Sequence, residues 1–191
     1  MNTLYPIFLK LSRLKILIIG GGKVGTEKIQ FILKNSPDAE ITVIAEQFSD
    51  ELKSSIEKNR RVILKEKSFE ENDVAGFQLV IAATNHHESN NAIYTAAKAR
   101  NILVNVADTP ELCDFYLGSI VSKGDLKIGI STNGKSPTVA KRLREFFEEI
   151  LPKDIDELIL NLNNYRTQLK GNLEEKVKIL NEITKPFSKE S

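Results

Sequence analysis

The chain has a single cysteine, no excess of charge of either sign and no long apolar run, and each absence narrows the possible functions. Cys113 is the one cysteine among 191 residues, which excludes an internal disulfide framework and a zinc site built from cysteines. Basic and acidic side chains number 27 and 26, so no overall positive field attracts nucleic acid. No apolar run approaches the roughly 18–20 residues that span a bilayer, and the first residues lack a signal-peptide pattern. We therefore expect a cytoplasmic protein with neither a membrane nor a nucleic-acid partner.

The most informative segment is a glycine-rich turn that directly follows a short apolar run. Ile16–Ile19 lead into Gly20, Gly22 and Gly25, spaced as Gly-x-Gly-x-x-Gly, and an amphipathic run follows. In a dinucleotide site the first glycine allows the tight turn, the second lets the backbone approach a pyrophosphate, and the third lets the helix pack against the strand. The sequence therefore predicts a dinucleotide site here, the alternative being a glycine-rich turn without a ligand.

The first part of the chain alternates strand and helix patterns. This alternation predicts right-handed βαβ units and an α/β fold with a doubly wound parallel sheet, which we expect to occupy residues 1–112 as a Rossmann domain. Strands are expected at 15–19, 40–45, 61–65, 77–83 and 102–106. Helices are expected at 23–34 and 88–100, and a further helix is expected to start after Ser49, its N-cap.

The pattern changes after residue 112. Two short strands flank a turn at 122–125, and Pro137 starts a helix that ends near Leu151. This small α+β segment, residues 113–150, has few residues for a core of its own, so we expect it to mediate a homodimer, or else to dock onto the Rossmann domain. Residues 151–191 are expected to form a helical C-terminal domain, with two helices broken near Gly171 and a frayed end at 188–191.

Polar residues that follow the predicted strands are candidates for cofactor binding. Glu46 lies 21 residues after Gly25, where an acid usually binds the adenosine ribose, although it can equally be a solvated loop carboxylate. Gln47 can hydrogen-bond the same ribose, and no arginine follows this strand to hold a 2′-phosphate, which favours NAD over NADP. Thr84 follows a later strand and can bind the cofactor or, like Asn85, cap the next helix.

Asn105 and Asp108 follow the fifth predicted strand. Asp108 lies just past the carboxyl end of what we take as a central strand, where a substrate would meet the nicotinamide. Its carboxylate can act as a general base or orient a cation, or it can simply form the turn before Pro110. The two histidines, His86 and His87, are adjacent and do not share a helix face, so we expect solvated loop residues and no metal site.

A second polar glycine loop, residues 131–137, opens the helix that starts at Pro137. It carries hydroxyl groups and Lys135, with Ser136 in the N-cap position, and Lys141, Arg142 and Arg144 follow. Such a loop is a good receptor for carboxylates or phosphates. An ordinary capped helix with a solvated basic face is the alternative.

Four passages together resemble the precorrin-2 dehydrogenase family, also called the siroheme synthase N-terminal domain family. They are Tyr-Pro-Ile-Phe-Leu at 5–9, Gly-Gly-Gly-Lys-Val-Gly at 20–25, Ala-Ala-Thr-Asn at 82–85 with Asn-Val-Ala-Asp at 105–108, and the run from Gly124 to Glu145. The last passage is the most specific, because simple Rossmann dehydrogenases lack it.

The resemblance implies a Rossmann domain, a dimerisation segment and a small helical domain in an intertwined homodimer. It also implies NAD-dependent oxidation of the tetrapyrrole precorrin-2 to sirohydrochlorin, a step toward siroheme. The essential aspartate of the family falls on Asp108, its loop serine or threonine falls on Thr132, and its cofactor contacts fall on Lys23, Val24, Glu46 and Gln47. Because precorrin-2 is a polycarboxylate, we expect it to contact Asn105, Thr132, Lys135 and Ser136.

Three positions depart from the family pattern: relatives often carry proline at the positions of Glu46 and Gly118 and glycine at the position of Asn133. Two other functions stay open. The protein can also insert Fe²⁺ or Co²⁺ into sirohydrochlorin, although a chain of this length suits a dehydrogenase beside a separate chelatase. It can instead be a nucleotide-sensing regulatory module, a class against which the segment 131–145 argues.

Overall fold

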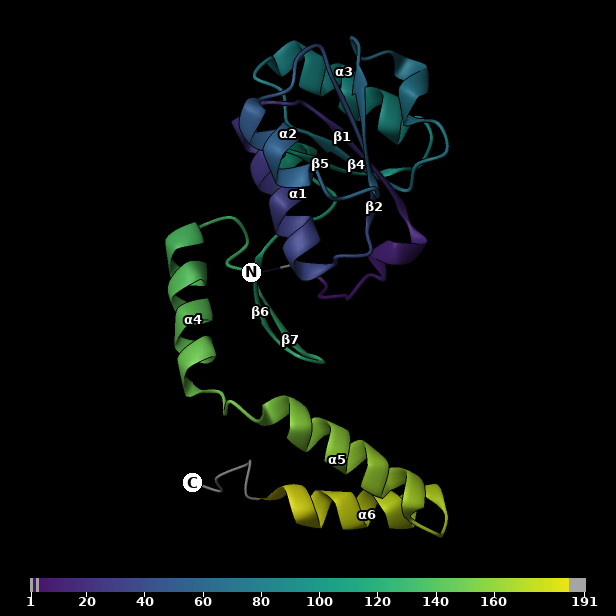
Figure 1. Ribbon diagram of the computed structural model, residues 1–191, viewed down its shortest axis with the longest axis vertical. Helices are drawn as coiled ribbons and strands as arrows, with labels where there is room; N and C mark the ends of the chain where they lie inside the picture. The colour runs from purple at the N-terminus through teal and green to yellow at the C-terminus, as the bar shows by residue number, and fades with distance from the viewer. Residues whose placement is uncertain (1, 3, 186–191) are drawn as a thin grey trace. The chain divides into compact units, whose positions relative to one another are not determined.

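The computed structural model describes residue 2 and residues 4–185, which form two compact units (Figure 1). The first comprises the described residues up to Gly118 together with Ser131–Ser136, and the second comprises Ser119–Ile130 and the described residues from Pro137. The division into three segments at 112 and 150 stays a prediction, and the expected frayed end at 188–191 lies outside the described residues. Within the described part of the chain, no helix has the length and apolar character to cross a membrane.

The first unit is built on a five-stranded parallel sheet, as the alternating pattern predicts. Its strand order is β3-β2-β1-β4-β5, so the direction of winding reverses between β1 and β4. Clefts for ligands in open α/β sheets lie at such a reversal, beyond the carboxyl ends of the strands. The strands are β1 (Lys15–Ile19), β2 (Glu40–Ala45), β3 (Val62–Glu66), β4 (Leu79–Ala82) and β5 (Leu103–Val106).

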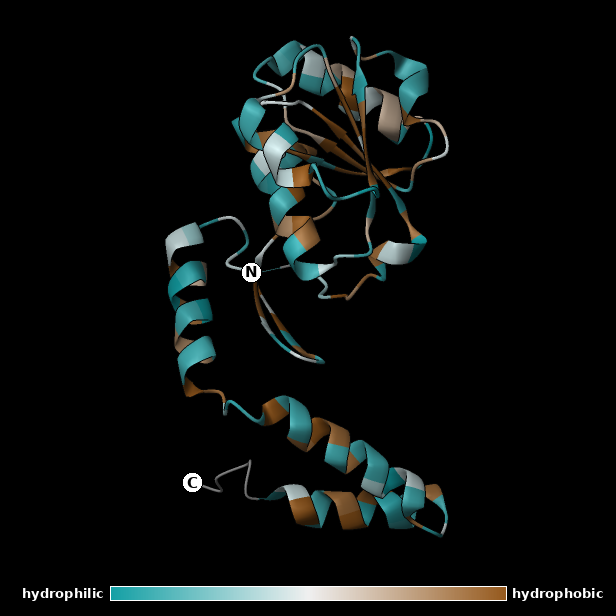
Figure 2. Ribbon diagram, viewed as in Figure 1, coloured by the Kyte–Doolittle hydropathy of each residue, from teal (hydrophilic) through white to brown (hydrophobic). Residues whose placement is uncertain are grey.

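Helices cover both faces of this sheet, and the core has two corresponding layers. Ile16 and Ile18 of β1 pack in one layer with residues of the first two helices, while Leu17 and Ile19 pack in the other with α3. Figure 2 shows the central strands of this sheet as mainly hydrophobic, because both faces of the sheet are buried there. The helices are α1 (Lys23–Asn35), α2 (Asp50–Ile56) and α3 (His87–Lys98), with 3-10 turns η1 (Leu11–Arg13), η2 (Glu71–Val74) and η3 (Pro110–Leu112).

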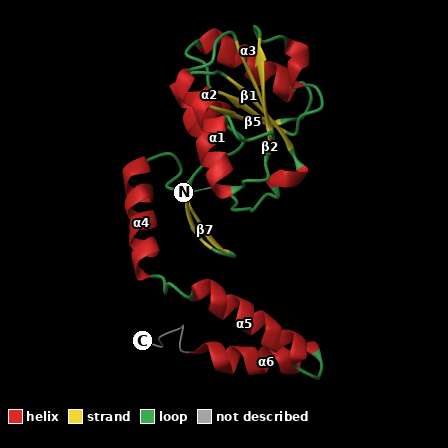
Figure 3. Cartoon of the chain, viewed as in Figure 1, coloured by secondary structure: helices red, strands yellow, loops and turns green. Residues whose placement is uncertain are grey.

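The second unit consists of a β-hairpin and three helices (Figure 3). The hairpin turns at Gly124, which has a φ of +54°, and the Asp125 N–H donates to Asp156 Oδ1 at 2.7 Å. Lys123 Nζ donates to the Leu151 carbonyl at 2.6 Å, so two contacts fasten the hairpin to the start of α5 and the residue that follows α4. The elements are β6 (Ser119–Lys123), β7 (Leu126–Ile130), α4 (Pro137–Ile150), α5 (Ile155–Gln168) and α6 (Leu173–Thr184).

One face of α4 is apolar and exposed. Val139, Leu143, Phe146 and Ile150 repeat at helical spacing along it, and their exposed fractions lie between 39% and 54%. Monomeric proteins rarely leave such a continuous apolar stripe in water. The stripe is therefore a candidate contact surface.

Candidate functional site

The glycine loop after β1 has the geometry that its sequence predicts. Gly20 has a φ of +124°, and a Cβ there would overlap the Ala83 backbone, whereas a Cβ on Gly25 would overlap the Gly20 carbonyl. Around Gly22 no heavy atom lies within 4 Å of the Cβ position. Close packing thus requires glycine at positions 20 and 25, whereas Gly22 leaves its side of the turn open to a ligand.

The same loop is fixed by hydrogen bonds from neighbouring elements. The Gly20 N–H donates to the Ile44 carbonyl of β2 at 2.9 Å, and the Ser49 N–H donates to the Gly21 carbonyl at 2.9 Å. Thr26, which is 1% exposed, donates its hydroxyl to the Gly22 carbonyl. No side chain among the described residues caps the N-terminus of α1, so its first N–H groups stay available to an anion.

A cleft of about 390 Å³ lies at the carboxyl ends of β1, β2 and β4. This volume falls within the range typical of small-molecule sites. Of the predicted cofactor residues, Gly20, Gly22, Val24, Glu46, Gln47 and Thr84 line it. Lys23 and Gly25 are not among its lining residues, since Gly25 is buried against Gly20 and Lys23 lies exposed at the start of α1.

Several lining residues were missed by the sequence reasoning. Lys67 and Phe69 follow β3, and His86 and Ser89 lie around the start of α3. Lys67 and Phe69 obey the same rule that pointed to Glu46, because they follow the carboxyl end of a strand next to β2. The signal was therefore present, but it required knowing that β2 and β3 are neighbours.

The carboxyl ends of β2 and β3 form a network of charged groups. Ser68 donates its hydroxyl to Glu46 Oε1 at 2.6 Å. Lys67 Nζ lies 3.1 Å from Asp73 Oδ1 and 3.3 Å from Glu70 Oε1. The hydrogen bond to Asp73 raises the pKa of Lys67, and the bond to Glu70 adds to this effect against the opposing influence of burial.

At the end of β4, a buried asparagine fixes the loop that carries Thr84. The Thr84 hydroxyl donates to Asn90 Oδ1 at 2.7 Å and accepts from the His86 N–H at 3.2 Å. Asn90, which is 6% exposed, returns a bond from Nδ2 to the Thr84 carbonyl at 3.2 Å. The N-cap of α3 is His86, so neither Thr84 nor Asn85 caps this helix.

The histidines do not meet at a metal site. His86 lines the cleft, whereas His87 Nδ1 lies 3.0 Å from Asn91 Nδ2 one turn further along α3. Over the described ranges, no group of histidine, cysteine, aspartate and glutamate side chains is arranged to hold a metal ion.

Asp108 lies just after β5 with an exposed carboxylate and a φ of +58°. Aspartate tolerates this left-handed conformation better than most residues do. The expectation that it follows a central strand was wrong, because β5 is at the edge of the sheet. No further strand of the described chain pairs with β5.

Asn105 of β5 is 5% exposed and faces the protein interior. Its Nδ2 donates to the Phe115 carbonyl at 2.8 Å and to Cys113 Sγ at 3.4 Å, whereas Oδ1 is buried and finds no partner among the described residues. Asn105 therefore fastens the segment after η3 to the sheet. Burial also raises the pKa of the Cys113 thiol, which stays protonated at neutral pH.

The second glycine loop is closed on itself by Thr132. Its Oγ1 accepts from the Ser136 N–H at 3.1 Å, and the Lys135 N–H donates to the Thr132 carbonyl at 3.1 Å. Asn133 and Gly134 have φ values of +55° and +73°, so the asparagine occupies the left-handed conformation that glycine favours. Lys135 is exposed.

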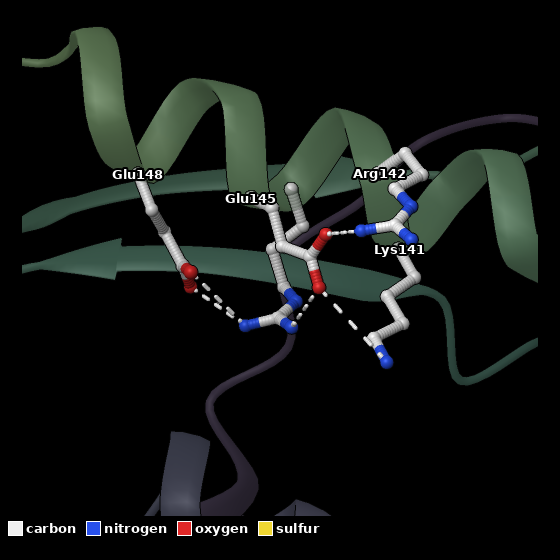
Figure 4. A network of polar contacts seen from close by, with 5 residues as sticks. Lys141, Arg142, Glu145 and Glu148 are labelled. Atoms are coloured by element: carbon white, nitrogen blue, oxygen red, sulfur yellow. Dashed lines mark hydrogen bonds and ion pairs between the residues drawn. The ribbon is translucent and has the colours of Figure 1, made fainter.

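The cations that follow on α4 are paired within the helix (Figure 4). Arg142 lies 2.8 Å from Glu145, Arg144 lies 2.9 Å from Glu148, and Lys141 lies 3.9 Å from Glu145. These pairs offset most of the basic charge that the sequence suggested as an anion receptor. Lys135, which lies on the loop and not on α4, is therefore the better candidate for binding an anion.

A doubly wound parallel sheet with this glycine turn and cleft defines a dinucleotide-binding protein of the Rossmann class. The family model "Putative NAD(P)-binding" matches residues 7–119, and the model "Sirohaem biosynthesis protein central" matches residues 123–150. The first model matches more than half of the chain, so the chain belongs to this family of NAD(P)-binding proteins, as its glycine motif predicts.

Similar proteins match both units. The siroheme synthase of Psychrobacter cryohalolentis is 35% identical over 173 residues, which are 91% of this chain and 32% of that protein. The siroheme synthase of Methylococcus capsulatus is 40% identical over 147 residues, 77% of this chain and 30% of that protein. The chain thus spans about a third of these relatives. The structure of SirC, a precorrin-2 dehydrogenase, is 26% identical and covers 97% of this chain and 94% of its own, with a TM-score of 0.73.

Proposed function

We propose that the protein catalyses the NAD-dependent oxidation of precorrin-2 to sirohydrochlorin. The observation that carries this proposal is the likeness to SirC, a precorrin-2 dehydrogenase, along 97% of the chain. The open glycine turn and the cleft at the sheet reversal support it, since they provide the space and the backbone donors that a dinucleotide needs.

The residues around the cleft fit NAD. The turn from Gly20 to Gly25, with the uncapped N–H groups of Lys23 and Val24, would hold the pyrophosphate. Glu46 and Gln47 would bind the adenosine ribose, and the loop at Thr84 would hold the cofactor further along the sheet edge. Bound NAD supplies the acceptor for a hydride.

Asp108 is the proposed catalytic residue. Oxidation of precorrin-2 to sirohydrochlorin removes two electrons and two hydrogens, one as a hydride and one as a proton. The Asp108 carboxylate is exposed and has no hydrogen-bond partner among the described residues, so it is free to accept that proton or to orient the macrocycle.

The substrate carboxylates would be bound by the loop that Thr132 closes. Lys135 offers a charge there, and the neighbouring Gly134 is exposed. Thr132 and Ser136 hold the loop through their mutual hydrogen bonds, and Asn105 holds the segment after η3. We therefore propose that these three residues contribute to substrate binding mainly by holding the backbone around the substrate in place.

A homodimer completes the proposal. The stripe Val139, Leu143, Phe146 and Ile150 on α4 is exposed and apolar, and a second copy of the chain would bury it.

The test is the absorbance spectrum of the protein incubated with precorrin-2 and NAD, first without metal and then with Co²⁺ or Fe²⁺. We expect sirohydrochlorin to form only when NAD is present. Metallation faster than in a protein-free control would add a chelatase activity to the dehydrogenase. If no NAD-dependent product forms, the proposal fails and a nucleotide-sensing role takes its place.

A further inference from the structure

The part of the cleft between β2 and β3 carries more negative than positive charge. Glu46 and Lys67 both line it, and Phe69 adds an apolar wall beside them. Glu70 and Asp73 lie behind Lys67, within 3.3 and 3.1 Å of its ammonium group. Two carboxylates therefore pair with the one ammonium group at this end, and Glu46 adds a third carboxylate to the lining.

Glu46 and Lys67, the two charged residues that line this end of the cleft, are both held in place by the segment that follows β3. Ser68 donates to Glu46 across the gap between the neighbouring strands, and the Lys67 N–H donates to the Ala45 carbonyl at 3.0 Å, which extends the pairing of β2 with β3. Asp73 also accepts from the Glu70 N–H at 2.8 Å, so the same carboxylate closes the turn of η2 and binds Lys67.

We infer that this segment, residues 67–73, selects the unphosphorylated dinucleotide. Ser68 positions Glu46 to accept the ribose hydroxyls, and Glu70 with Asp73 occupies Lys67, which would otherwise pair with a 2′-phosphate. The inference rests on the proposed function to the extent that the cleft holds a dinucleotide.

Electrostatics give the reason. A 2′-phosphate brings close to two negative charges at neutral pH, and Glu46, which lines the cleft, would repel it. A lysine near Glu46 with no carboxylate partner of its own could offset this repulsion, as a basic residue does in sites that accept NADP. Lys67 is the one cation among the described residues that line the cleft, and it already has two carboxylate partners.

The first experiment measures dissociation constants of NAD and NADP by calorimetry, with the full chain and no precorrin-2. We expect the double variant Glu70→Gln/Asp73→Asn to bind NADP about tenfold more tightly than the unchanged chain does, because a charge-assisted hydrogen bond becomes available. Both amides keep a hydrogen-bond acceptor for the turn of η2. Adding Lys67→Met should remove the gain, and Glu71→Gln, on the same turn, should leave both constants unchanged.

The second experiment tests how Ser68 positions Glu46. Ser68→Ala should weaken NAD binding about three- to tenfold through the loss of a hydrogen bond to a charged group, and should raise the KM for NAD without lowering kcat. Ser68→Thr should restore the binding, which a general structural defect would not allow.

The outcomes separate this inference from the proposed function. If the unchanged chain binds neither dinucleotide, both fail. The unchanged chain can also bind NAD while neither Glu70→Gln/Asp73→Asn nor Glu70→Gln alone changes the ratio of the NAD and NADP dissociation constants. In that case the inference fails and the proposed function stands. Glu70 is exposed, so the single variant gives an answer even if the double variant does not fold.

Discussion

Asp108 combines an exposed carboxylate with a left-handed backbone, and substitutions at this residue affect both properties. Asparagine tolerates the φ of +58° and removes only the charge, whereas alanine adds backbone strain of about 1–2 kcal/mol. We expect Asp108→Asn to lower kcat about 100-fold or more, the typical contribution of a general base, with an unchanged unfolding midpoint.

The control for this experiment is Asp108→Gly, which relaxes the backbone and also lacks the carboxylate. It should be as inactive as Asp108→Asn, while Asp108→Ala should be inactive and less stable. Steady-state kinetics with thermal unfolding measure both effects. Full activity and an unchanged KM in Asp108→Asn would remove Asp108 from the chemistry.

Two glycines of the β1 turn give a matched pair of substitutions. A Cβ at Gly22 meets open space, so Gly22→Ala should fold normally and weaken NAD binding by occupying the surface that the pyrophosphate would approach. A Cβ at Gly25 overlaps the Gly20 carbonyl, so Gly25→Ala should lower the free energy of unfolding by about 1–3 kcal/mol. Calorimetric NAD titration and denaturant unfolding separate the two. Equal effects of both substitutions on stability would contradict this division of roles.

The residues that sequence reasoning found follow from local rules, and those it missed follow from long-range pairing. The positions of Gly20, Gly22 and Glu46 at the cleft could be predicted because each closely follows the end of one strand. Ser68 could not, since its bond to Glu46 spans 22 residues and exists only because β2 and β3 pair.

Among the elements of the second unit, the hairpin turn is fastened to α5 at a position that favours glycine. A Cβ on Gly124 would overlap the Asp156 carboxylate, and its φ of +54° disfavours other residues. We expect Gly124→Ala to cost about 1–3 kcal/mol of unfolding free energy. Gly129→Ala on β7, where a Cβ meets no atom within 4 Å, is the control and should change stability little. Similar losses in both variants would exclude this specific contact.

Helix α4 provides the test of the proposed homodimer. Phe146 is 52% exposed in the middle of the apolar stripe, so Phe146→Asp should shift the mass measured by sedimentation toward the monomer. Leu160 on α5 is 55% exposed and lies outside this stripe, which makes Leu160→Asp the matched control. A dimer that survives Phe146→Asp at low micromolar concentration would place the interface elsewhere.

All five strands of the sheet were predicted, but their bounds were predicted with unequal accuracy. The bounds of β1 and β2 agree with the prediction, and Ser49 caps α2 by accepting from the Leu52 N–H at 3.2 Å. β4 is shorter than the predicted 77–83 run, because Phe77 follows the Gly76 turn and Ala83 lies beyond the last ladder pair, Ile19 with Ala82. Apolar runs alone do not reveal where pairing ends.

At the scale of the whole molecule, the alternation of strands and helices determined the fold class, whereas the order of the strands was not accessible from it. The placement of Asp108 after an edge strand is the clearest example, since sheet order depends on which distant strands pair. The cleft was predictable in outline, because ligands in this fold lie beyond the carboxyl ends of the strands wherever the order reverses.

The dehydrogenase activity is tested most directly by the stoichiometry of its two products, measured without oxygen. Protein, precorrin-2 and NAD are mixed anaerobically, and the absorbance of NADH and of sirohydrochlorin is recorded in the same sample. We expect one NADH for each sirohydrochlorin and no product when NAD is omitted. Sirohydrochlorin that appears at the same rate without NAD, or without matching NADH, would contradict the assignment of the chain as a dehydrogenase.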